Sequence, residues 1–190
     1  MIGGLVLAAG AGTRFGSSSK LLAELDGRPL LSYAVAAQTA VRELERVVVV
    51  LGAFAEEVLD RVSFGRAEPV ICREWESGQA VSLRCGLAAL PDASRVIVTL
   101  GDAPLVTPDV IRIFSAAAPG TRAVYGGRPG HPVVLGSAQV RALSSLEGDL
   151  GARDLLRGGP TIECGELCSG SDVDTPEDLE AVRDEARAVV

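Results

Sequence analysis

The sequence predicts an α/β fold: one three-layer domain built on a mostly parallel, mixed sheet. Apolar, β-rich runs alternate with helical patterns along the chain. The runs Ile2–Ala8, Arg46–Leu51 and Arg95–Leu100 are apolar nearly throughout, which is typical of parallel strands covered by helices on both faces. No internal repeat and no linker interrupts the 190 residues, so residues 1–190 are expected to form a single domain.

Four strands and three helices are predicted in the first hundred residues. The strand Pro69–Cys72 joins the three strands already named. Apolar residues at helical spacing, with Pro at the start of the first helix and Pro91 after the third, predict the helices. These are Pro29–Val41, Ala55–Val62 and Gln79–Leu90.

The pattern changes in the second half of the chain. A cap at Thr107 predicts a helix from Pro108 to about Ala117. Strands at Arg122–Tyr125 and Pro132–Leu135 flank the Gly-rich connection GGRPGH and predict a hairpin. The remaining predicted elements are short helices near Ser137–Leu146 and Gly151–Leu156, a strand at Thr161–Cys164, and a terminal helix at Pro176–Val189.

Composition narrows the classes of partner. The chain has 18 basic and 25 acidic residues, a net charge of -7, which argues against a broad nucleic-acid surface. No apolar run approaches the ~18 residues of a membrane span, and the N-terminus lacks the basic region of a signal peptide. The four cysteines lack metal-binding spacing. We therefore expect a cytoplasmic chain with reduced thiols that binds a small anionic ligand locally, without nucleic acid or membrane.

The most informative segment is LAAGAGTRFGSSSK, residues 7–20. A buried strand that opens into glycines places a loop at the carboxyl edge of the sheet, where α/β proteins bind ligands. Gly10, Gly12 and Gly16 allow close approach of the backbone, and their amides can form an anion-binding nest. Arg14 and Lys20, the only lysine among 18 basic residues, add the positive charge that a polyphosphate needs.

Two familiar nucleotide-binding motifs do not fit this loop. The glycines read G-x-G-x-x-x-G, one residue longer than the dinucleotide fingerprint, and the second strand ends in Leu51-Gly52-Ala53 without the expected acidic residue. A Walker A loop requires Ser or Thr after its lysine, whereas Leu21 follows Lys20. A Gly-rich turn without function is the remaining plain interpretation.

A family resemblance rests on several segments in order. LAAGAGTRFG with Lys20, followed by DGRPLL at 26–31, resembles the opening of MobA-like nucleotidyltransferases. ESGQAVSLR with GL, in residues 76–87, is similar to a segment of the molybdenum cofactor cytidylyltransferase branch. GDAP at 101–104, GHP at 130–132, GDLGAR at 148–153 and DVDTPEDL at 172–179 are similar to later family segments, so the resemblance covers nearly the whole chain.

The resemblance implies a Rossmann-like, glycosyltransferase-A-like fold and a nucleotidyltransferase activity. The implied enzyme moves CMP from CTP to the phosphate of molybdenum-molybdopterin and releases pyrophosphate, with Mg²⁺ or Mn²⁺ as its metal. In the family, Ala at the position of Ala9 goes with CTP, whereas Gly there goes with GTP. A molybdoenzyme is the implied recipient of the product.

Two carboxylates are the expected metal ligands. Asp102 directly follows the strand Arg95–Leu100 and Gly101, at the same sheet edge as the Gly-rich loop. Mg²⁺ typically binds through one or two carboxylates plus substrate phosphates. In the resembling family the acidic residue of G-D-x-P binds the metal and a polar residue of the C-terminal motif assists. Asp174 is the first choice for that second ligand, and Asp172 stays open as the alternative.

Other site residues are carried over from the resemblance. Arg14, Lys20 and Asp102 are the expected catalytic residues, and the two cations would hold the triphosphate and neutralise the leaving pyrophosphate. Because the nucleophile is a phosphate, no general base is required. The expected nucleotide-binding residues are Leu7, Ala8, Ala9, Gly10, Gly12, Thr13, Arg14, Lys20, Gln79 and Ser82, and those expected at the acceptor are His131, Asp149 and Arg153.

Alternatives remain open at this point. Asp174 can be a helix cap, His131 a turn residue, and the polar groups near Gln79 an ordinary helix start. For the whole chain, the alternatives are a nucleotidyltransferase acting on a sugar or alcohol phosphate, an NAD(P)-dependent oxidoreductase, and a non-enzymatic molybdenum cofactor carrier.

Overall fold

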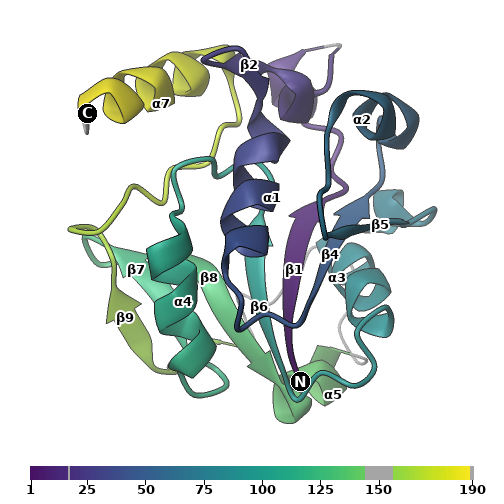
Figure 1. Cartoon of the computed structure of the whole chain (residues 1–190), viewed down its shortest axis with the longest axis vertical. Coiled ribbons are helices and arrows are strands. Elements are labelled where there is room, and N and C mark those ends of the chain that lie inside the picture. Colours follow the sequence, from purple (N-terminus) through teal and green to yellow (C-terminus); the bar gives the residue numbers. More distant parts are fainter. Residues whose placement is uncertain (17, 144–155, 189–190) are drawn as a thin grey trace.

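The described part of the chain is organised around one seven-stranded sheet. The computed structural model describes residues 1–16, 18–143 and 156–188. The sheet order is β5-β4-β1-β6-β8-β7-β9, and a small separate sheet pairs β2 with β3 (Figure 1). The strands are β1 (Ile2–Ala8), β2 (Glu24–Leu25), β3 (Arg28–Pro29), β4 (Arg46–Leu51), β5 (Glu68–Ile71), β6 (Arg95–Leu100), β7 (Arg122–Tyr125), β8 (Arg128–Gly136) and β9 (Thr161–Glu163).

The large sheet is mostly parallel, as predicted. β1 pairs in parallel with β4 on one side and with β6 on the other, and β5 and β9 extend the two edges in parallel with β4 and β7. Among the described strands of this sheet, only β8 runs in the opposite direction. The carboxyl ends of β1, β4 and β6 therefore meet at one edge of the sheet.

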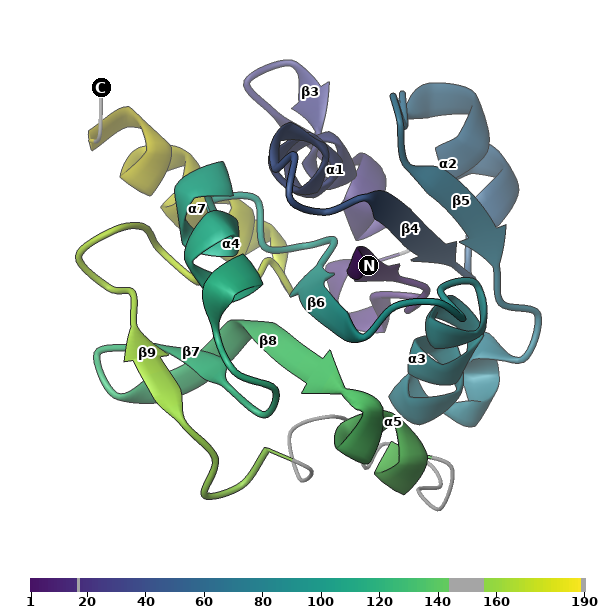
Figure 2. The same cartoon turned by 60° about the horizontal axis from the view of Figure 1, so that its bottom comes forward.

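Helices cover both faces, which explains why the central strands are apolar at consecutive positions. Figure 2 shows α1 (Leu30–Ala40) and α4 (Pro108–Ala116) on one side of the sheet, and α3 (Gln79–Ala88) and α5 (Ser137–Leu143) on the other. Each face has its own apolar cluster. α2 (Ala55–Arg61) contributes Ala55 and Val58 to the same cluster as α1 and α4. Alternate residues of a strand such as β4 belong to one cluster or the other, so apolar side chains cover both faces of the sheet.

A third, smaller apolar cluster lies under the C-terminal helix α7 (Pro176–Ala188). Leu179 and Val182 of α7 pack with Leu25 of β2 and Leu30 of α1. Val173, in the segment leading to α7, is fully buried in this cluster. The cluster fixes the C-terminal segment beside the carboxyl edge of the sheet.

Several predicted boundaries need correction. Pro29 does not begin the first helix; it ends β3, because a short β2–β3 hairpin precedes α1. β8 is longer than predicted, and the hairpin turn lies at Gly126 and Gly127, both at positive φ. The predicted helix Gly151–Leu156 lies almost wholly outside the described residues, as does the end of the one near Ser137–Leu146.

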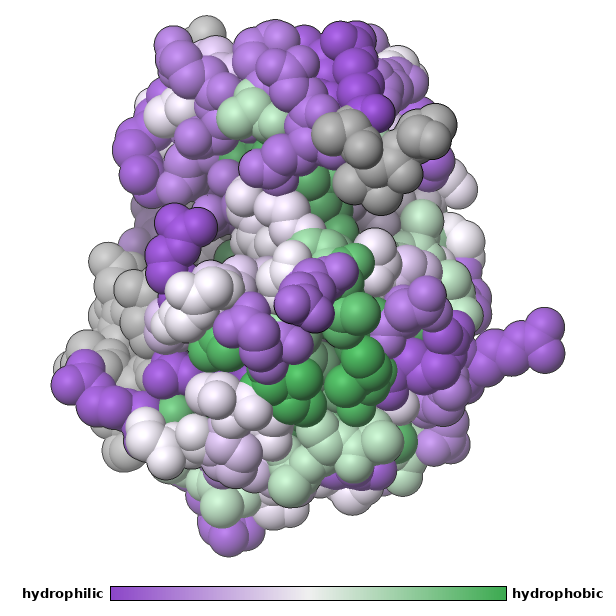
Figure 3. Space-filling view, turned by 90° about the vertical axis from the view of Figure 1, so that its left-hand side faces the viewer, coloured by the Kyte–Doolittle hydropathy of each residue, from purple (hydrophilic) through white to green (hydrophobic). Residues whose placement is uncertain are grey.

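The side of the molecule formed by α4, β9 and α7 carries an apolar area bordered by polar side chains (Figure 3). Ile113 of α4 and Leu167, just beyond β9, are 40% and 53% exposed. Neither lines the cavity described below. A search of the described residues finds no helix that is both long and apolar enough to cross a bilayer.

Candidate active site

A cavity of about 810 Å³ opens at the carboxyl edge of the sheet. It brings together segments from the whole length of the chain: the loop after β1, the start of α3, the end of β6, β8 and the segment before α7. Except for Gly16 of the Gly-rich loop, every predicted site residue that the structure describes lines it. These residues are Leu7, Ala8, Ala9, Gly10, Gly12, Thr13, Arg14, Lys20, Gln79, Ser82, Asp102, His131, Asp172 and Asp174.

The Gly-rich loop leaves β1 in a conformation that needs its glycines. Gly12 adopts φ 60° and precedes a short 3₁₀ turn, Thr13–Phe15. A Cβ on Gly12 would lie 3.0 Å from the Cγ and Cδ atoms of Lys20, so the loop packs directly on the lysine stem. A Cβ on Gly10 would meet nothing within 4 Å, which leaves open space above the loop backbone. The first N–H groups of such a turn have no acceptor within it and can bind an anion.

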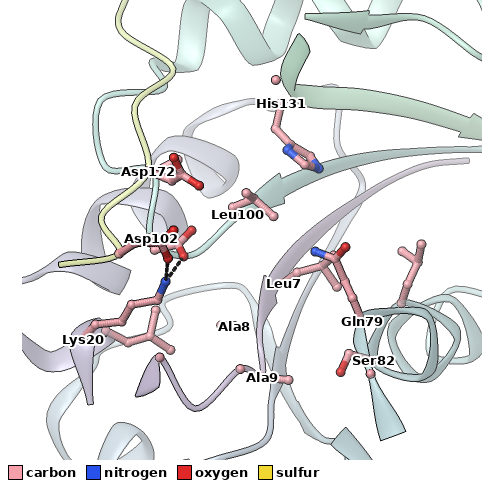
Figure 4. A pocket seen from close by; sticks show the side chains of 18 of the residues that line it. Leu7, Ala8, Ala9, Lys20, Gln79, Ser82, Leu100, Asp102, His131 and Asp172 are labelled. Atoms are coloured by element: carbon pink, nitrogen blue, oxygen red, sulfur yellow. Dashed lines mark hydrogen bonds and ion pairs between the residues drawn. The ribbon is translucent and has the colours of Figure 1, made fainter. Parts of the chain in front are cut away.

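Lys20 lies between two carboxylates at this end of the cavity. Its Nζ is 2.5 Å from Oδ2 of Asp102 and 2.8 Å from Oδ1 of Asp174, and Arg14 approaches the other oxygen of Asp174 at 2.7 Å. The side chains of Lys20, Asp102 and Asp174 are 10%, 17% and 29% exposed. Figure 4 shows the ammonium of Lys20 beside the carboxylate of Asp102, with Asp172 nearby.

Burial and charge act in opposition on these groups. Burial alone would lower the pKa of Lys20, but the adjacent carboxylates, Asp102 first, hold the pKa of its ammonium above the ordinary value. Burial raises the pKa of Asp102, and the negative charge of Asp172 adds to that rise, while Lys20 opposes both. The cluster is therefore a compact charge network whose members depend on one another.

The segment before α7 supplies two of the carboxylates. The N–H of Val173 donates to the carbonyl of Asp102 at 2.9 Å, and the Val173 side chain is buried in the apolar cluster under α7. Its neighbours Asp172 and Asp174 both line the cavity. Residues two apart share one face of a strand, but this segment is not a strand; burial of the Val173 side chain between them directs both carboxylates to the cavity instead.

Capping of α7 holds this segment in place. The carboxylate of Asp178 accepts hydrogen bonds from the N–H groups of Asp174 and Thr175, at 3.0 and 2.8 Å. The Thr175 hydroxyl donates to the same Asp178 carboxylate and accepts from the N–H of Asp178, which completes a reciprocal cap. The hydrogen bond from the Thr175 hydroxyl contributes most to lowering the pKa of Asp178. The helix cap is thus formed by Thr175 and Asp178, while Asp174 is directed to the cavity.

The other side of the cavity combines the start of α3 with β8. Ser82 is buried, and Gln79 points into the cavity toward His131 on the opposite wall (Figure 4). His131 lies within strand β8, not in a turn. Asp149 and Arg153, the other predicted acceptor residues, lie outside the described residues.

Sequence reasoning missed several residues of the cavity wall. Trp75, which comes just before α3, lines the cavity, and so do Leu100 of β6 and Leu156. Arg122 of β7 also lines it, although its strand reads only as apolar RAVY with a charged first residue. The position of Arg122 at the cavity depends on how β7 pairs with β8, and no local sequence motif predicts that pairing.

The donor set fits a hard divalent cation that also binds substrate phosphates. Among the described residues, no group of three or more His, Cys, Asp or Glu side chains is arranged to hold a metal by itself. Asp102 and Asp174 nonetheless bind the same ammonium nitrogen, so their oxygens converge on one point. Mg²⁺ and Mn²⁺ prefer oxygen ligands, and Mg²⁺ usually takes only one or two carboxylates beside phosphate oxygens. The residues present therefore fit such an ion.

Comparison with known proteins places this chain in a family. A curated relative, nicotine blue oxidoreductase of Paenarthrobacter nicotinovorans, is 36% identical over 93% of both chains. The crystal structure of the Mycobacterium tuberculosis Rv0371c homologue from Mycobacterium sp. strain JC1 has a TM-score of 0.83 and 26% identity, and covers 100% of this chain and 98% of that one. Rv0371c of M. tuberculosis H37Rv in complex with manganese has a TM-score of 0.76 and 25% identity, with 96% and 98% covered. The model of the MobA-like NTP transferase domain matches residues 4–164, and the chain belongs to this nucleotidyltransferase family.

Proposed function

We propose that this protein transfers CMP from CTP to the phosphate of a molybdopterin-type acceptor, with release of pyrophosphate and with Mg²⁺ or Mn²⁺ as the metal. The observation that carries the proposal is the meeting of the Gly-rich loop, Lys20 and the carboxylates of Asp102 and Asp174 at one end of a cavity. A nucleoside triphosphate needs this combination of amides, cations and metal-binding oxygens.

The chain's own residues would position the nucleotide. The loop from Gly10 to Arg14 would hold phosphate oxygens through its amides, and Arg14 and Lys20 would neutralise the pyrophosphate as it leaves. Gln79 and Ser82 offer hydrogen bonds to the base from the start of α3, beside the buried backbone of Ala8 and Ala9. Ala9 favours CTP on the family pattern.

Asp102 and Asp174 would hold the divalent cation. When bound, the ion would stabilise the negative charge that develops on the phosphate oxygens. The manganese complex of Rv0371c supports a divalent metal for this fold. Lys20 now pairs with both carboxylates, so its ammonium would have to leave this position for Asp102 and Asp174 to hold an ion together.

The acceptor phosphate would enter from the side of His131. A phosphate is already a nucleophilic anion, so alignment with the α-phosphorus suffices and no base is needed. The direct delivery of the product to a molybdoenzyme in the cytoplasm completes the proposal.

One relative favours a second candidate. Nicotine blue oxidoreductase carries the name of a redox enzyme, and its similarity to this chain extends over nearly its full length. An NAD(P)H-dependent reduction of a flat dye-like substrate in the same cavity is therefore the alternative. The glycine spacing of the loop and the end of β4 at Leu51, without an acidic residue, argue against dinucleotide binding.

The decisive experiment measures both activities on one preparation. Pyrophosphate release is followed with CTP, GTP, ATP and UTP, with Mg²⁺ or Mn²⁺ and purified molybdenum-molybdopterin; NAD(P)H oxidation is followed in parallel with a flat quinone-type acceptor. We expect pyrophosphate release with CTP preferred, and its loss in Asp102→Asn. If no nucleotide gives pyrophosphate release and NAD(P)H is oxidised, the oxidoreductase function would replace the proposed one.

A further inference from the structure

Tyr125 lies directly behind the part of the cavity wall that contains His131. It is the last residue of β7, is partly buried and does not itself line the cavity. Two glycines that do line the cavity, Gly130 in β8 and Gly170 in the segment before α7, pack on its ring. Tyr125 therefore contacts the wall of the cavity without being part of it.

The ring of Tyr125 occupies the space that side chains at positions 130 and 170 would need. A Cβ on Gly130 would lie 2.8 Å from Cε2 and 2.9 Å from Cδ2 of the ring, and a Cβ on Gly170 would overlap the same two atoms. Neither glycine has a positive φ, so the ring, and not the backbone conformation, excludes a side chain at both positions. The ring thus sets how closely β8 and the segment before α7 approach each other.

The hydroxyl of Tyr125 holds an irregular part of β8. The pairing of β8 with β7 shifts in register between Pro129 and Val133, and His131 lies within the shifted stretch. Bulges of this kind redirect a side chain and are frequent beside active sites. The Tyr125 hydroxyl donates to the carbonyl of His131 at 2.6 Å. It therefore fixes the backbone of the residue whose side chain lines the cavity opposite Gln79 (Figure 4).

The segment that leads to the carboxylates passes on the other side of Tyr125. The Sγ of Cys168 lies 4.0 Å from the Tyr125 hydroxyl oxygen, and two residues after Gly170 the chain reaches Asp172 at the cavity. Burial first, and then the neighbouring Cys168 thiol, raises the pKa of Tyr125. The hydroxyl thus stays protonated and remains a donor to the His131 carbonyl.

We propose that Tyr125 is a positioning residue for the acceptor: its hydroxyl fixes the backbone of His131, and its ring sets the separation between β8 and the segment before α7. The inference rests on the proposed function for the reaction, and it names the residue that aligns the acceptor side of the cavity with the carboxylates. A displacement of about 1 Å of a reacting group can cost about 100-fold in rate. The Gly-rich loop follows β1, and β6 and β8 separate β1 from β7, so nucleotide binding should be spared.

Tyr125→Phe removes the hydroxyl and keeps the ring. Its KM for the acceptor, purified molybdenum-molybdopterin, should rise about tenfold, while its KM for CTP stays within about twofold. Tyr33→Phe is the matched control, because Tyr33 donates to the carbonyl of Leu25 at the same 2.6 Å and does not line the cavity. Both variants lose one hydrogen bond to a backbone carbonyl and should lose similar stability, but only Tyr125→Phe should affect the acceptor.

Gly170→Ala tests the contact of the ring from the other side. Its new methyl group would overlap the Tyr125 ring, so the ring and the segment before α7 must move apart. The KM for the acceptor should rise as it does in Tyr125→Phe. Gly136→Ala is the matched control: its methyl group would lie 2.7 Å from Cβ of Pro119, at the end of β8 that does not line the cavity.

The single histidine of the chain reports the position of this wall without any turnover. The full chain without an affinity tag has only the imidazole of His131 to observe in a proton–carbon correlation spectrum. Tyr125→Phe keeps the aromatic ring, so a change in the imidazole signals reflects movement of His131. The signals should move in Tyr125→Phe and Gly170→Ala and stay in place in Tyr33→Phe and Gly136→Ala.

The outcomes distinguish the two proposals. If no nucleotide gives pyrophosphate release but the imidazole signals move only in Tyr125→Phe and Gly170→Ala, the proposed function fails and the positioning role stands. Imidazole signals that are unchanged in Tyr125→Phe would overturn the positioning role. An unchanged KM for the acceptor in this variant, or an equal rise in the KM values for CTP and the acceptor, would also overturn it.

Discussion

Replacing Lys20 by Met tests the charge network at the centre of the site. Met has a similar length but no charge, so Asp102 and Asp174 would face each other without the ammonium that now lies 2.5 and 2.8 Å from them. Arg14 would still neutralise one oxygen of Asp174. The variant should unfold more readily, because two largely buried carboxylates lose their common counter-charge.

The magnitude follows from the burial of the three groups. Removing one partner of a fully buried ion pair costs about 3–5 kcal/mol. Asp174 is 29% exposed and retains Arg14, so the expected loss here lies at about 2–3 kcal/mol. For a chain of 190 residues this corresponds to a fall in melting temperature of roughly 5–10 °C.

The pH dependence has a definite sign. The pKa of Asp102 is raised by burial even with Lys20 present, and loss of the ammonium raises it further. A carboxyl with a raised folded-state pKa destabilises the fold at pH values above its unfolded pKa of about 4 and is relieved by protonation. The stability difference between wild type and Lys20→Met should therefore be largest near pH 8 and shrink as the solution is acidified toward pH 4.

Thermal unfolding measured with and without Mn²⁺ completes the test. In Lys20→Met no ammonium competes with the ion for Asp102 and Asp174. Mn²⁺ should therefore raise the melting temperature of this variant more than that of the wild type, while turnover falls. The double variant with Asp102→Asn, which has one carboxylate fewer, should lose the extra gain. Equal stability of Lys20→Met and wild type at pH 8, or a difference that does not respond to acid, would refute the reasoning.

Three further changes test the surroundings of the site. In Gly52→Ala the new Cβ would collide with the Ala9 carbonyl and lie 2.6 Å from the Trp75 ring. This overpacking should lower the free energy of unfolding by about 1–3 kcal/mol. Nucleotide affinity measured by calorimetry should fall at least tenfold, and an unchanged affinity would contradict this prediction. Asp178→Ala removes the carboxylate whose pKa is lowered, first by the Thr175 hydroxyl, so its deficit in melting temperature should be present above about pH 4 and vanish as pH falls through the lowered value. A deficit that persists at pH 2 would argue against the cap. Arg66→Ala removes three hydrogen bonds to carbonyls around the end of α1 and should cost about 1–3 kcal/mol in urea unfolding without changing nucleotide affinity.

The sequence predicted those parts of the fold that depend on local composition. The bounds of β1, β4, β6 and β7 agree with the predicted runs, because continuous apolar residues between helical segments have few alternatives in a parallel sheet. The β2–β3 hairpin was missed because two-residue strands have no periodicity to detect. The start of α1 was wrong for the same reason, since Pro29 belongs to the hairpin.

The candidate site was predictable as a set of residues but not as a set of contacts. Glycine spacing and the position of Asp102 after a buried strand located the cavity edge. The ion pair of Lys20 with Asp174 joins residues 154 positions apart, and only tertiary packing of Val173 under α7 brings them together. Arg122 was missed because its position facing the cavity depends on the β7–β8 register.

The segment before α7 also sets an order on how the site is assembled during synthesis. All the described strands end by Glu163, and the family model ends at 164, so the sheet and the Gly-rich loop are complete before Asp172 and Asp174 are translated. Domains tend to fold from the N-terminal side as the chain emerges from the ribosome. The residues that form the sheet are therefore synthesised before the segment that supplies the second carboxylate beside Lys20. That segment is the last part of the proposed site to be added to the chain.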